Sequence, residues 1–288
     1  MSTRADARVV TKSAEGLPWA LWLRQVASIL KLEVKKNFRG RRAVLIYLLA
    51  LLPVLIFGAI ALIPPSVGGR SEPAFVNMMF ANIFEILILR TVLFFGCAWI
   101  FMNLFRGEVV DRSLHYYFLS PLRREVLVAG KYLSGLLTSV ILFGSATLIS
   151  LVLLYLPMGY SASLQLLSEG NGLKYGLTYL AITVLACAGY GALFLLIGLL
   201  FRNPVIPALL VYGWEFINFL LPPVLKKLSV IHYLQSLMPL PLSEGPFAIV
   251  AEPTPAWVAV PTLLLMTGLV LLFSSIQIRW MEIKYGGE

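Results

Sequence analysis

Charged residues are scarce in this sequence, and their scarcity decides the class of protein. Only 13% of the 288 residues are charged, 59% are hydrophobic, and the mean hydropathy is +0.86. Soluble domains carry about 25% charged residues. The composition therefore excludes an ordinary soluble domain and predicts an integral membrane protein.

Cysteine and histidine are nearly absent, with two of each. Cys97 and Cys187 fall inside apolar runs, where cysteine packs as a small hydrophobic residue more often than it forms a disulfide or a metal pair. His115 and His232 fall on opposite sides of the membrane in the topology derived below. We therefore expect no metal site.

Motifs for nucleotide hydrolysis and proteolysis are missing as well. The phosphate-binding pattern GxxxxGK[ST] does not occur, because Glu125 stands where that loop needs glycine, five residues before Gly130-Lys131. HExxH and GxSxG are also absent. We expect a chain that is neither an enzyme nor its own ATPase and that holds no cofactor.

The long apolar runs predict an all-α polytopic membrane protein. Uninterrupted runs of about 20 residues are typical of transmembrane helices, whereas the strands of a membrane barrel alternate polar and apolar residues. Six spans are predicted, at residues 43–63, 75–105, 132–156, 175–201, 205–221 and 256–278. The second run is longer than a bilayer requires, so we expect it to tilt or to extend past the membrane.

The Lys and Arg residues orient these spans. Cationic segments near span ends stay in the cytoplasm. Of 23 Lys and Arg residues, 18 fall in the segments assigned to the inside and four in those assigned to the outside. We predict a multi-pass protein of the inner (plasma) membrane with both termini cytosolic. This pattern also explains the net charge of +9 without a nucleic-acid partner.

The segments outside the predicted permease domain at 43–278 have distinct patterns. Residues 1–17 are polar and small, as in a disordered cytosolic tail. Residues 18–42 predict an amphipathic helix in the membrane interface or, alternatively, one packed on a cytosolic partner. Its apolar stripe comprises Trp19, Leu23, Val26, Leu30, Val34 and Phe38. Residues 279–288 form a cytosolic C-terminal tail.

The segment at 222–255, on the predicted outside, is too apolar for an ordinary solvated loop. We expect one or two short external helices there that dip into the outer leaflet before the last span. A bilayer permits irregular backbone at that depth only where protein or water covers it.

The central loop at 106–131 is the only long polar segment within the hydrophobic body. The apolar residues Val109, Val110, Leu114, Tyr117 and Phe118 recur at helical spacing, which predicts a short amphipathic helix that ends before Pro121. Such a helix can dock on a partner. It can equally lie on lipid headgroups with its aromatic residues as anchors.

The order of residues in this loop resembles the cytosolic signature of ABC transporter type-2 permeases. The match comprises Glu108, the turn-like Asp111-Arg112-Ser113, Leu114, Leu119, Ser120-Pro121, Arg124 and Gly130-Lys131. Arg112-Ser113 stands where that family usually has Gly-Thr. The resemblance implies a coupling helix that contacts an ATPase subunit. The coupling residues it implies are Glu108, Asp111, Arg112, Leu114, Tyr117, Phe118, Pro121, Arg124 and Lys131.

The resemblance also implies a function. Two permease subunits, identical or related, would associate within the membrane lipids, and each would bind an ABC ATPase that holds ATP and Mg. The path would be lined by the first, second and fifth spans, and export of a lipid-like, amphipathic or hydrophobic compound would follow. Two alternatives remain open: an ATPase-independent channel or secondary transporter, and a membrane scaffold that docks a cytosolic partner.

Three charged residues lie inside predicted spans, namely Glu85, Arg90 and Glu215. Charges at the centre of a span are costly and usually face a partner or a path. At about 1.5 Å per residue, Arg90 and Glu215 lie about 24 Å and about 20 Å from the cytosolic ends of their helices. We therefore predict an Arg90–Glu215 pair, with Glu85 as the competing partner of Arg90. The pair has either a packing role or a role in the substrate path.

Overall fold

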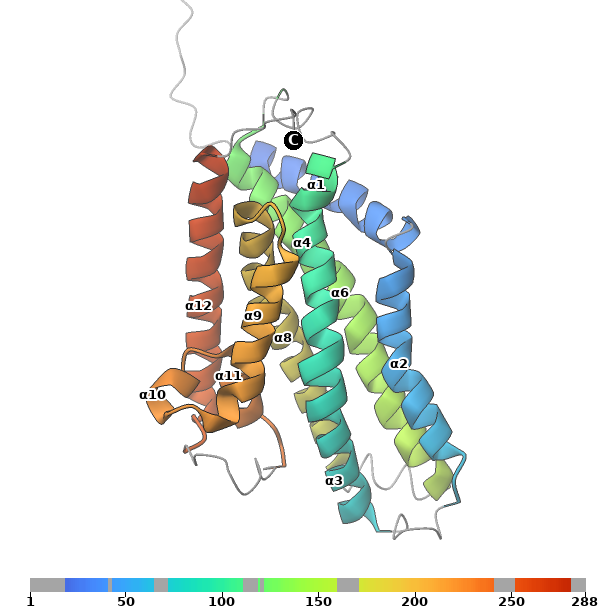
Figure 1. Cartoon of the computed structure of the whole chain (residues 1–288). Helices are drawn as coiled ribbons and strands as arrows, with labels where there is room; N and C mark the ends of the chain where they lie inside the picture. The colour runs from blue at the N-terminus through green and yellow to red at the C-terminus, as the bar shows by residue number, and fades with distance from the viewer. Residues whose placement is uncertain are drawn as a thin grey trace, which may run out of the picture.

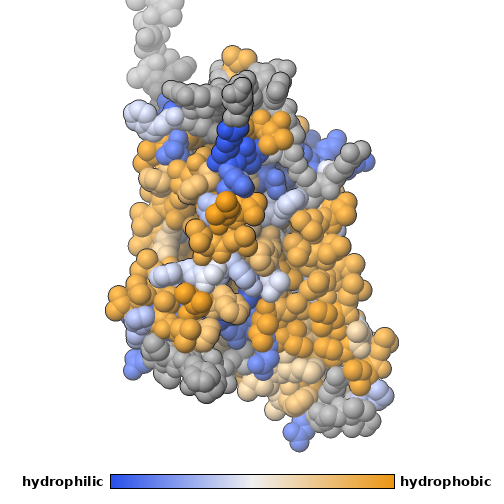
Figure 2. Space-filling view, viewed as in Figure 1, coloured by the Kyte–Doolittle hydropathy of each residue, from blue (hydrophilic) through white to orange (hydrophobic). Residues whose placement is uncertain are grey.

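The computed structural model describes residues 19–40, 43–64, 72–110, 119, 122–159, 171–240 and 252–280. All secondary structure in these ranges is helical, and the long helices stand side by side in one bundle (Figure 1). The surface in Figure 2 is mainly hydrophobic across the middle of the bundle, and hydrophilic residues gather toward its two ends. This distribution fits a body surrounded by lipid.

Five helices are long and apolar enough to cross a membrane, as a multi-pass membrane protein requires. They are α2 (Ala43–Ala61), the continuous helix α3–η1–α4 (Pro73–Val110), α6 (Arg124–Tyr155) with its extension η2 (Leu156–Met158), α8 (Gly172–Leu200), and α12 (Ala256–Gln277) with η4 (Ile278–Trp280). The α3–η1–α4 helix has 38 residues, nearly twice the about 20 that a span needs.

The predicted fifth span is shorter than expected. The α-helix α9 (Val205–Phe216) has 12 residues, and a tight 3₁₀ turn, η3 (Ile217–Leu220), adds four. The chain then turns at Pro222 into two short helices, α10 (Pro223–Lys226) and α11 (Val230–Ser236), which stand where short helices were predicted before the last span. A straight span of about 20 residues is therefore not formed here, and the six-span topology stays a prediction.

The amphipathic helix α1 (Trp19–Arg39) lies across one end of the bundle and leads into α2 (Figure 1). We call this the α1 end. The residues of α1 that are buried are Ile29 and Glu33, whereas Trp19 is 62% exposed and Leu23 is 68% exposed. The predicted apolar stripe is therefore not the face that packs on the bundle along its whole length. A face that contains a glutamate packs there instead.

The core of the bundle lies between α4 (Phe94–Val110), α6 and α8. Aromatic rings fill it, with Phe94 against both Tyr190 and Phe194 in edge-on contacts. A Cβ atom on Gly191 would overlap the ring of Phe101, so α8 needs glycine there to lie close to α4. Cys97 and Cys187 are both buried in this core as free thiols.

The middle of the second span is a π-helix, η1 (Phe84–Leu93), between α3 (Pro73–Ile83) and α4. The hydroxyl of Thr91 donates a hydrogen bond of 3.1 Å to the carbonyl oxygen of Ile86, five residues earlier. π-Helical turns bring residues five apart onto one face and are frequent at functional sites. Glu85 and Arg90 have this spacing.

Candidate functional site

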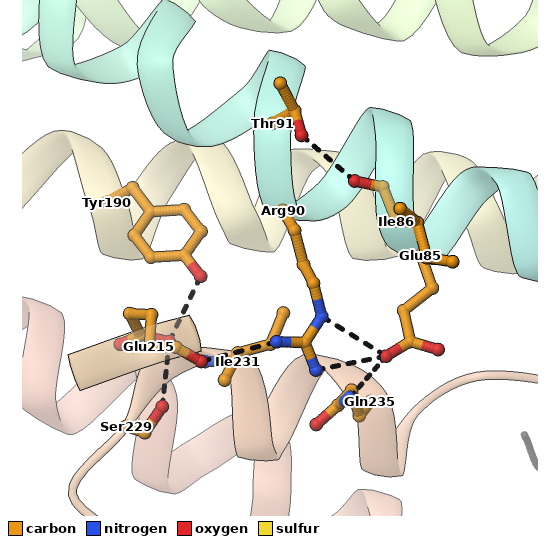
Figure 3. A network of polar contacts seen from close by, with 9 residues as sticks. All are labelled: Glu85, Ile86, Arg90, Thr91, Tyr190, Glu215, Ser229, Ile231 and Gln235. Atoms are coloured by element: carbon orange, nitrogen blue, oxygen red, sulfur yellow. Dashed lines mark hydrogen bonds and ion pairs between the residues drawn. The ribbon is translucent and has the colours of Figure 1, made fainter. Parts of the chain in front are cut away.

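Polar side chains gather at two buried places in this apolar bundle. We call the first the lysine cluster, which comprises Glu33, Lys36, Glu108 and Lys131 at the α1 end. We call the second the arginine network. It comprises Glu85, Arg90, Tyr190, Glu215, Ser229 and Gln235 (Figure 3). Each cluster contains residues that the sequence predicts to be functional.

Lys131 is the centre of the lysine cluster and is completely buried. Its ammonium nitrogen Nζ lies 2.7 Å from Oε1 of Glu33 and 2.7 Å from Oε1 of Glu108, and it donates to the carbonyl oxygen of Leu104 at 2.9 Å. A lysine ammonium has three protons to donate. These three contacts match that number, so each proton of the buried ammonium group has an acceptor.

Three helices supply this cluster. Glu33 comes from α1, Glu108 from the last turn of α4, and Lys131 from the first third of α6. Gly130 lets α1 approach, because a Cβ atom at that position would lie 3.0 Å from the side chain of Ile29. The Gly-Lys pair thus has two roles: glycine admits α1 and lysine binds its glutamate.

The charges of the cluster balance. Lys36 of α1 adds a second cation 3.5 Å from Oε1 of Glu108. Burial alone would raise the pKa of Glu33, but the charge of Lys131, the hydrogen bonds with Glu108 and Lys131, and the charge of Lys36 together outweigh burial and lower it. The stabilisation that comes from ionised Glu33 is therefore present at neutral pH, and it is lost as the pH falls below the ordinary titration range of glutamate.

The start of α6 also binds α12 at the α1 end. One guanidinium nitrogen of Arg124 donates to the carbonyl oxygens of Ile278 and Arg279, at 3.0 Å and 2.9 Å. Arg279 forms an ion pair of 2.6 Å with Glu125, and Arg123 stacks 4.7 Å above the ring of Trp22 in α1. The start of α6, which belongs to the predicted central loop, therefore contacts α1, α4 and α12 together.

Arg90 finds its carboxylate partner on its own helix (Figure 3). Its nitrogens Nη2 and Nε lie 3.2 Å and 3.4 Å from Oε1 of Glu85, and Gln235 of α11 donates to the same oxygen. The contact of Arg90 with Glu215 is a hydrogen bond of 3.3 Å to the main-chain oxygen of that residue. The predicted carboxylate pair of Arg90 with Glu215 is therefore wrong, and Glu85, the competing partner that the sequence analysis named, binds the guanidinium because the π-helix presents it there.

The carboxylate of Glu215 instead binds the start of α11. Its Oε1 accepts from the amide of Val230 at 3.0 Å, and its Oε2 accepts from the amide of Ile231 at 2.9 Å and the hydroxyl of Ser229 at 2.7 Å. Tyr190 of α8 donates to Oε2 at 3.3 Å. The first N–H groups of a helix have no acceptor within the helix, so a carboxylate that accepts from them stabilises the start of α11.

The space that the charged residues of this network line together is small. Arg90, Tyr190 and Glu215 line a space of about 10 Å³, which is about the volume that one water molecule needs. In the described part of the chain, no group of three or more His, Cys, Asp or Glu residues could hold a metal ion. Arg90 pairs with Glu85, and the Glu215 carboxylate is bound by the start of α11, which favours a role of the network in holding η1, α9 and α11 together.

Several predicted coupling residues lie outside the described residues. These are Asp111, Arg112, Leu114, Tyr117, Phe118 and Pro121. His115 also lies outside the described residues. Leu119, the one described residue between 111 and 121, is 79% exposed. Glu108 and Lys131, from the two sides of that loop, are brought together in the lysine cluster, whereas Arg124 binds the end of α12. His232 lies on α11 and contacts Thr254 at 3.1 Å.

Some residues of both clusters were missed by the sequence analysis. Glu33 had a usable signal, because it is the only acidic residue in an otherwise basic helix from Trp19 to Arg39. Tyr190, Ser229 and Gln235 are uncharged residues in apolar surroundings, and no pattern in the sequence links them to Glu85 or Glu215. Comparison with models of protein families finds no match to this chain, and comparison with curated proteins finds none either.

Proposed function

We propose that this chain is the membrane subunit of an ATP-driven ABC transporter of the type-2 permease class. It would pair with a second permease subunit, identical or related, and each would bind a separate ATPase subunit that supplies ATP and Mg. The likeness of the central loop to the signature of that class supports the proposal. The observation that carries it is the ion pair of Glu108 with Lys131, because these signature residues flank the loop.

The lysine cluster gives this proposal a mechanical basis. A force applied to residues 111–121 acts on the end of α4 and the start of α6, since those helices lead into and out of the loop. Glu108 and Lys131 are bound to each other and to Glu33, so α1 must follow any displacement of the loop. Arg124 extends the same connection to α12. ATP-driven closure of the ATPase subunits would therefore move four helices together.

The proposal assigns the α1 end to the cytosol of a cell whose inner membrane holds the protein. Lys36, Arg39, Arg106 and Arg124 lie at the ends of the helices that meet there, as the orientation rule for cations requires. In this topology α9 and η3 together act as the fifth span and α10 and α11 lie outside. An export path for a lipid-like, amphipathic or hydrophobic substrate would pass between the two permease subunits.

An ATPase-independent channel or secondary transporter is the competing function. It would need ions or protons to pass Arg90 and Glu215. The space that Arg90 and Glu215 line together is about 10 Å³, and a second space, of about 190 Å³, is lined by Glu215 but not by Arg90. The Glu215 carboxylate accepts four hydrogen bonds from the protein. Side chains held by so many bonds within the protein favour a structural role for Arg90 and Glu215 over a role in an ion path. We therefore prefer the ATP-driven transporter to the channel.

Copurification from the native host tests the proposal. The tagged chain is expected to elute with vanadate-sensitive ATP hydrolysis, and Tyr117→Asp or Phe118→Asp is expected to remove that activity from the eluate, because a charge in an apolar docking contact is costly. The matched control is Leu173→Asp, an equally drastic change of an exposed residue at the far end of the bundle. It should leave the activity in place.

Two results would overturn the proposal. One is an eluate in which the control and both loop variants lose ATP hydrolysis equally. The other is solute flux by the purified chain in liposomes at its full rate without ATP or a second protein, which would favour the channel instead.

A further inference from the structure

A cavity of about 190 Å³ lies between α8, α9, α12 and the start of α11, and Glu215 of the arginine network reaches its wall. Leu193 of α8, Val211 and Trp214 of α9, and Met266 and Val270 of α12 form most of its apolar lining. Figure 1 shows α9 in front of α8, with α12 beside them. The cavity therefore belongs to the side of the bundle on which the short helix α9 lies.

The oxygen atoms in the wall are already bonded within the protein. The hydroxyl of Thr267 donates to the carbonyl oxygen of Leu263 at 2.8 Å, and the carboxylate of Glu215 is held by Ser229 and the start of α11. A polar ligand would have to lose its hydration without gaining these groups as partners, which is costly. Trp214 adds an indole N–H to the wall, and the rest of the lining is mainly apolar, which favours an occupant made of carbon and hydrogen.

The size of the cavity agrees with this. An engineered protein cavity of about 150 Å³ with an aliphatic and aromatic lining stays dry and binds benzene or xenon. The cavity here is larger than that and partly open to the outside, and its mainly apolar lining offers few partners to ordered water. An empty space of this size would also leave its lining without dispersion contacts on one side.

The depth of the cavity indicates which hydrocarbon is available. The residues of α12 that line it fall between Leu263 and Val270, in the middle of a helix that runs from Ala256 to Gln277. The middle of a membrane-spanning helix is surrounded by acyl chains. Of the residues of α9, Ala208 and Glu215 are buried, and exposed residues such as Leu209 and Leu210 form its outer face.

We propose that this cavity binds one hydrocarbon chain of an amphiphile. The chain comes either from a membrane phospholipid or from the alkyl tail of a single-chain amphiphile, and both share the same chemistry. The bound chain fills the space behind α9 and supports that helix against α8 and α12. This site uses no residue of the lysine cluster or the central loop, so it stands or fails independently of the ATPase partner.

Photolabelling in reconstituted vesicles tests the site. The protein is placed in vesicles that contain either phosphatidylcholine with a diazirine in one acyl chain or palmitic acid with a diazirine, and labelled residues are mapped by mass spectrometry. We expect labelling of Met266, which lines the cavity. Val270→Phe fills the cavity with a ring and is expected to abolish the labelling of Met266.

Outward residues of the same helix provide the control. Leu265 and Leu269 are exposed and should be labelled by bulk lipid in both the original protein and the Val270→Phe variant. Leu269→Phe, a change of the same kind outside the cavity, should leave the labelling of Met266 intact. The probe that labels Met266 identifies the source of the chain.

The proposal is overturned if Met266 is labelled by neither probe, or if its labelling persists when the cavity is filled. Size-exclusion chromatography and thermal unfolding check that Val270→Phe folds. Should it not fold, Leu193→Phe fills the same space from α8 and is read in the same way.

Discussion

The lysine cluster and the arginine network place charge in an apolar bundle in different ways. The lysine cluster joins residues about a hundred positions apart, such as Glu33 and Lys131, and its cation is enclosed by two carboxylates from other helices. In the arginine network, Arg90 and Glu85 are five positions apart on one helix. The first arrangement holds helices together through charge, whereas the second neutralises its charge locally.

This difference determines what each cluster can transmit. Movement of α1 relative to α4 and α6 must break contacts of Lys131, so the lysine cluster makes these helices move together. The Arg90–Glu85 pair can travel with its helix intact. Its links to α9 and α11 are the hydrogen bonds from Arg90 to the main chain of Glu215 and from Gln235 to Glu85.

Lys131→Met should show the largest effect of the substitutions considered. It leaves Glu33 and Glu108 buried without their cation, and breaking a buried ion pair from one side costs about 3 to 5 kcal/mol of the free energy of unfolding. Thermal unfolding in detergent measures this loss. Lys35→Met, an exposed lysine on the same helix as Glu33, is the matched control and should have little effect.

A triple variant separates charge from packing. If the cost comes from unpaired carboxylates, adding Glu33→Gln and Glu108→Gln to Lys131→Met should restore much of the lost stability. A triple variant that is as unstable as Lys131→Met would show instead that the shape of the lysine side chain matters, and the comparison drawn above would fail.

Glu215→Gln should have an intermediate effect. An amide keeps one acceptor oxygen but turns an NH₂ group toward the amides of Val230 and Ile231, which leaves buried donors without partners. Such a loss costs about 1 to 3 kcal/mol. Hydrogen exchange at the Val230 and Ile231 amides should become faster, because their opening no longer breaks a bond to a carboxylate.

Glu252→Gln is the control for this substitution, since Glu252 is exposed and lies before α12. Unchanged exchange at both amides in Glu215→Gln would contradict the assignment of Glu215 as the cap of α11. Faster exchange throughout the bundle would indicate general loosening rather than a local one.

The sequence alone predicted the all-helical membrane class and the approximate positions of the five long helices, because runs of apolar residues and cations at their ends reflect simple solvation. It also singled out Glu108, Lys131, Glu85, Arg90 and Glu215, since charges in apolar surroundings are conspicuous. How these residues pair depends on contacts between helices, which a linear pattern does not contain.

One error and one omission have physical causes. The prediction of an Arg90–Glu215 ion pair assumed straight α-helices, in which residues five apart do not share a face, but η1 is a π-helix and aligns Arg90 with Glu85. The prediction for α1 placed its apolar stripe in the membrane interface or on a partner, and it stays a prediction. The burial of Glu33 was not foreseen, because its pairing with Lys131 is invisible from α1 alone.

Glu125→Gln should have the smallest effect on stability, because it removes a charge at the surface of the α1 end rather than a buried one. Its ion pair with Arg279 is short at 2.6 Å, yet Arg279 is 61% exposed, so water and salt screen it. Exposed pairs contribute less than about 1 kcal/mol. The midpoint of thermal unfolding should therefore barely change. Any dependence of that midpoint on salt concentration should become weaker.

A loss of stability as large as that of Lys131→Met would contradict this expectation. It would mean that the end of α12 is held by this pair and not by the bonds from Arg124 to the carbonyl oxygens of Ile278 and Arg279. Charge at the surface of the α1 end would then matter as much as charge buried beneath it.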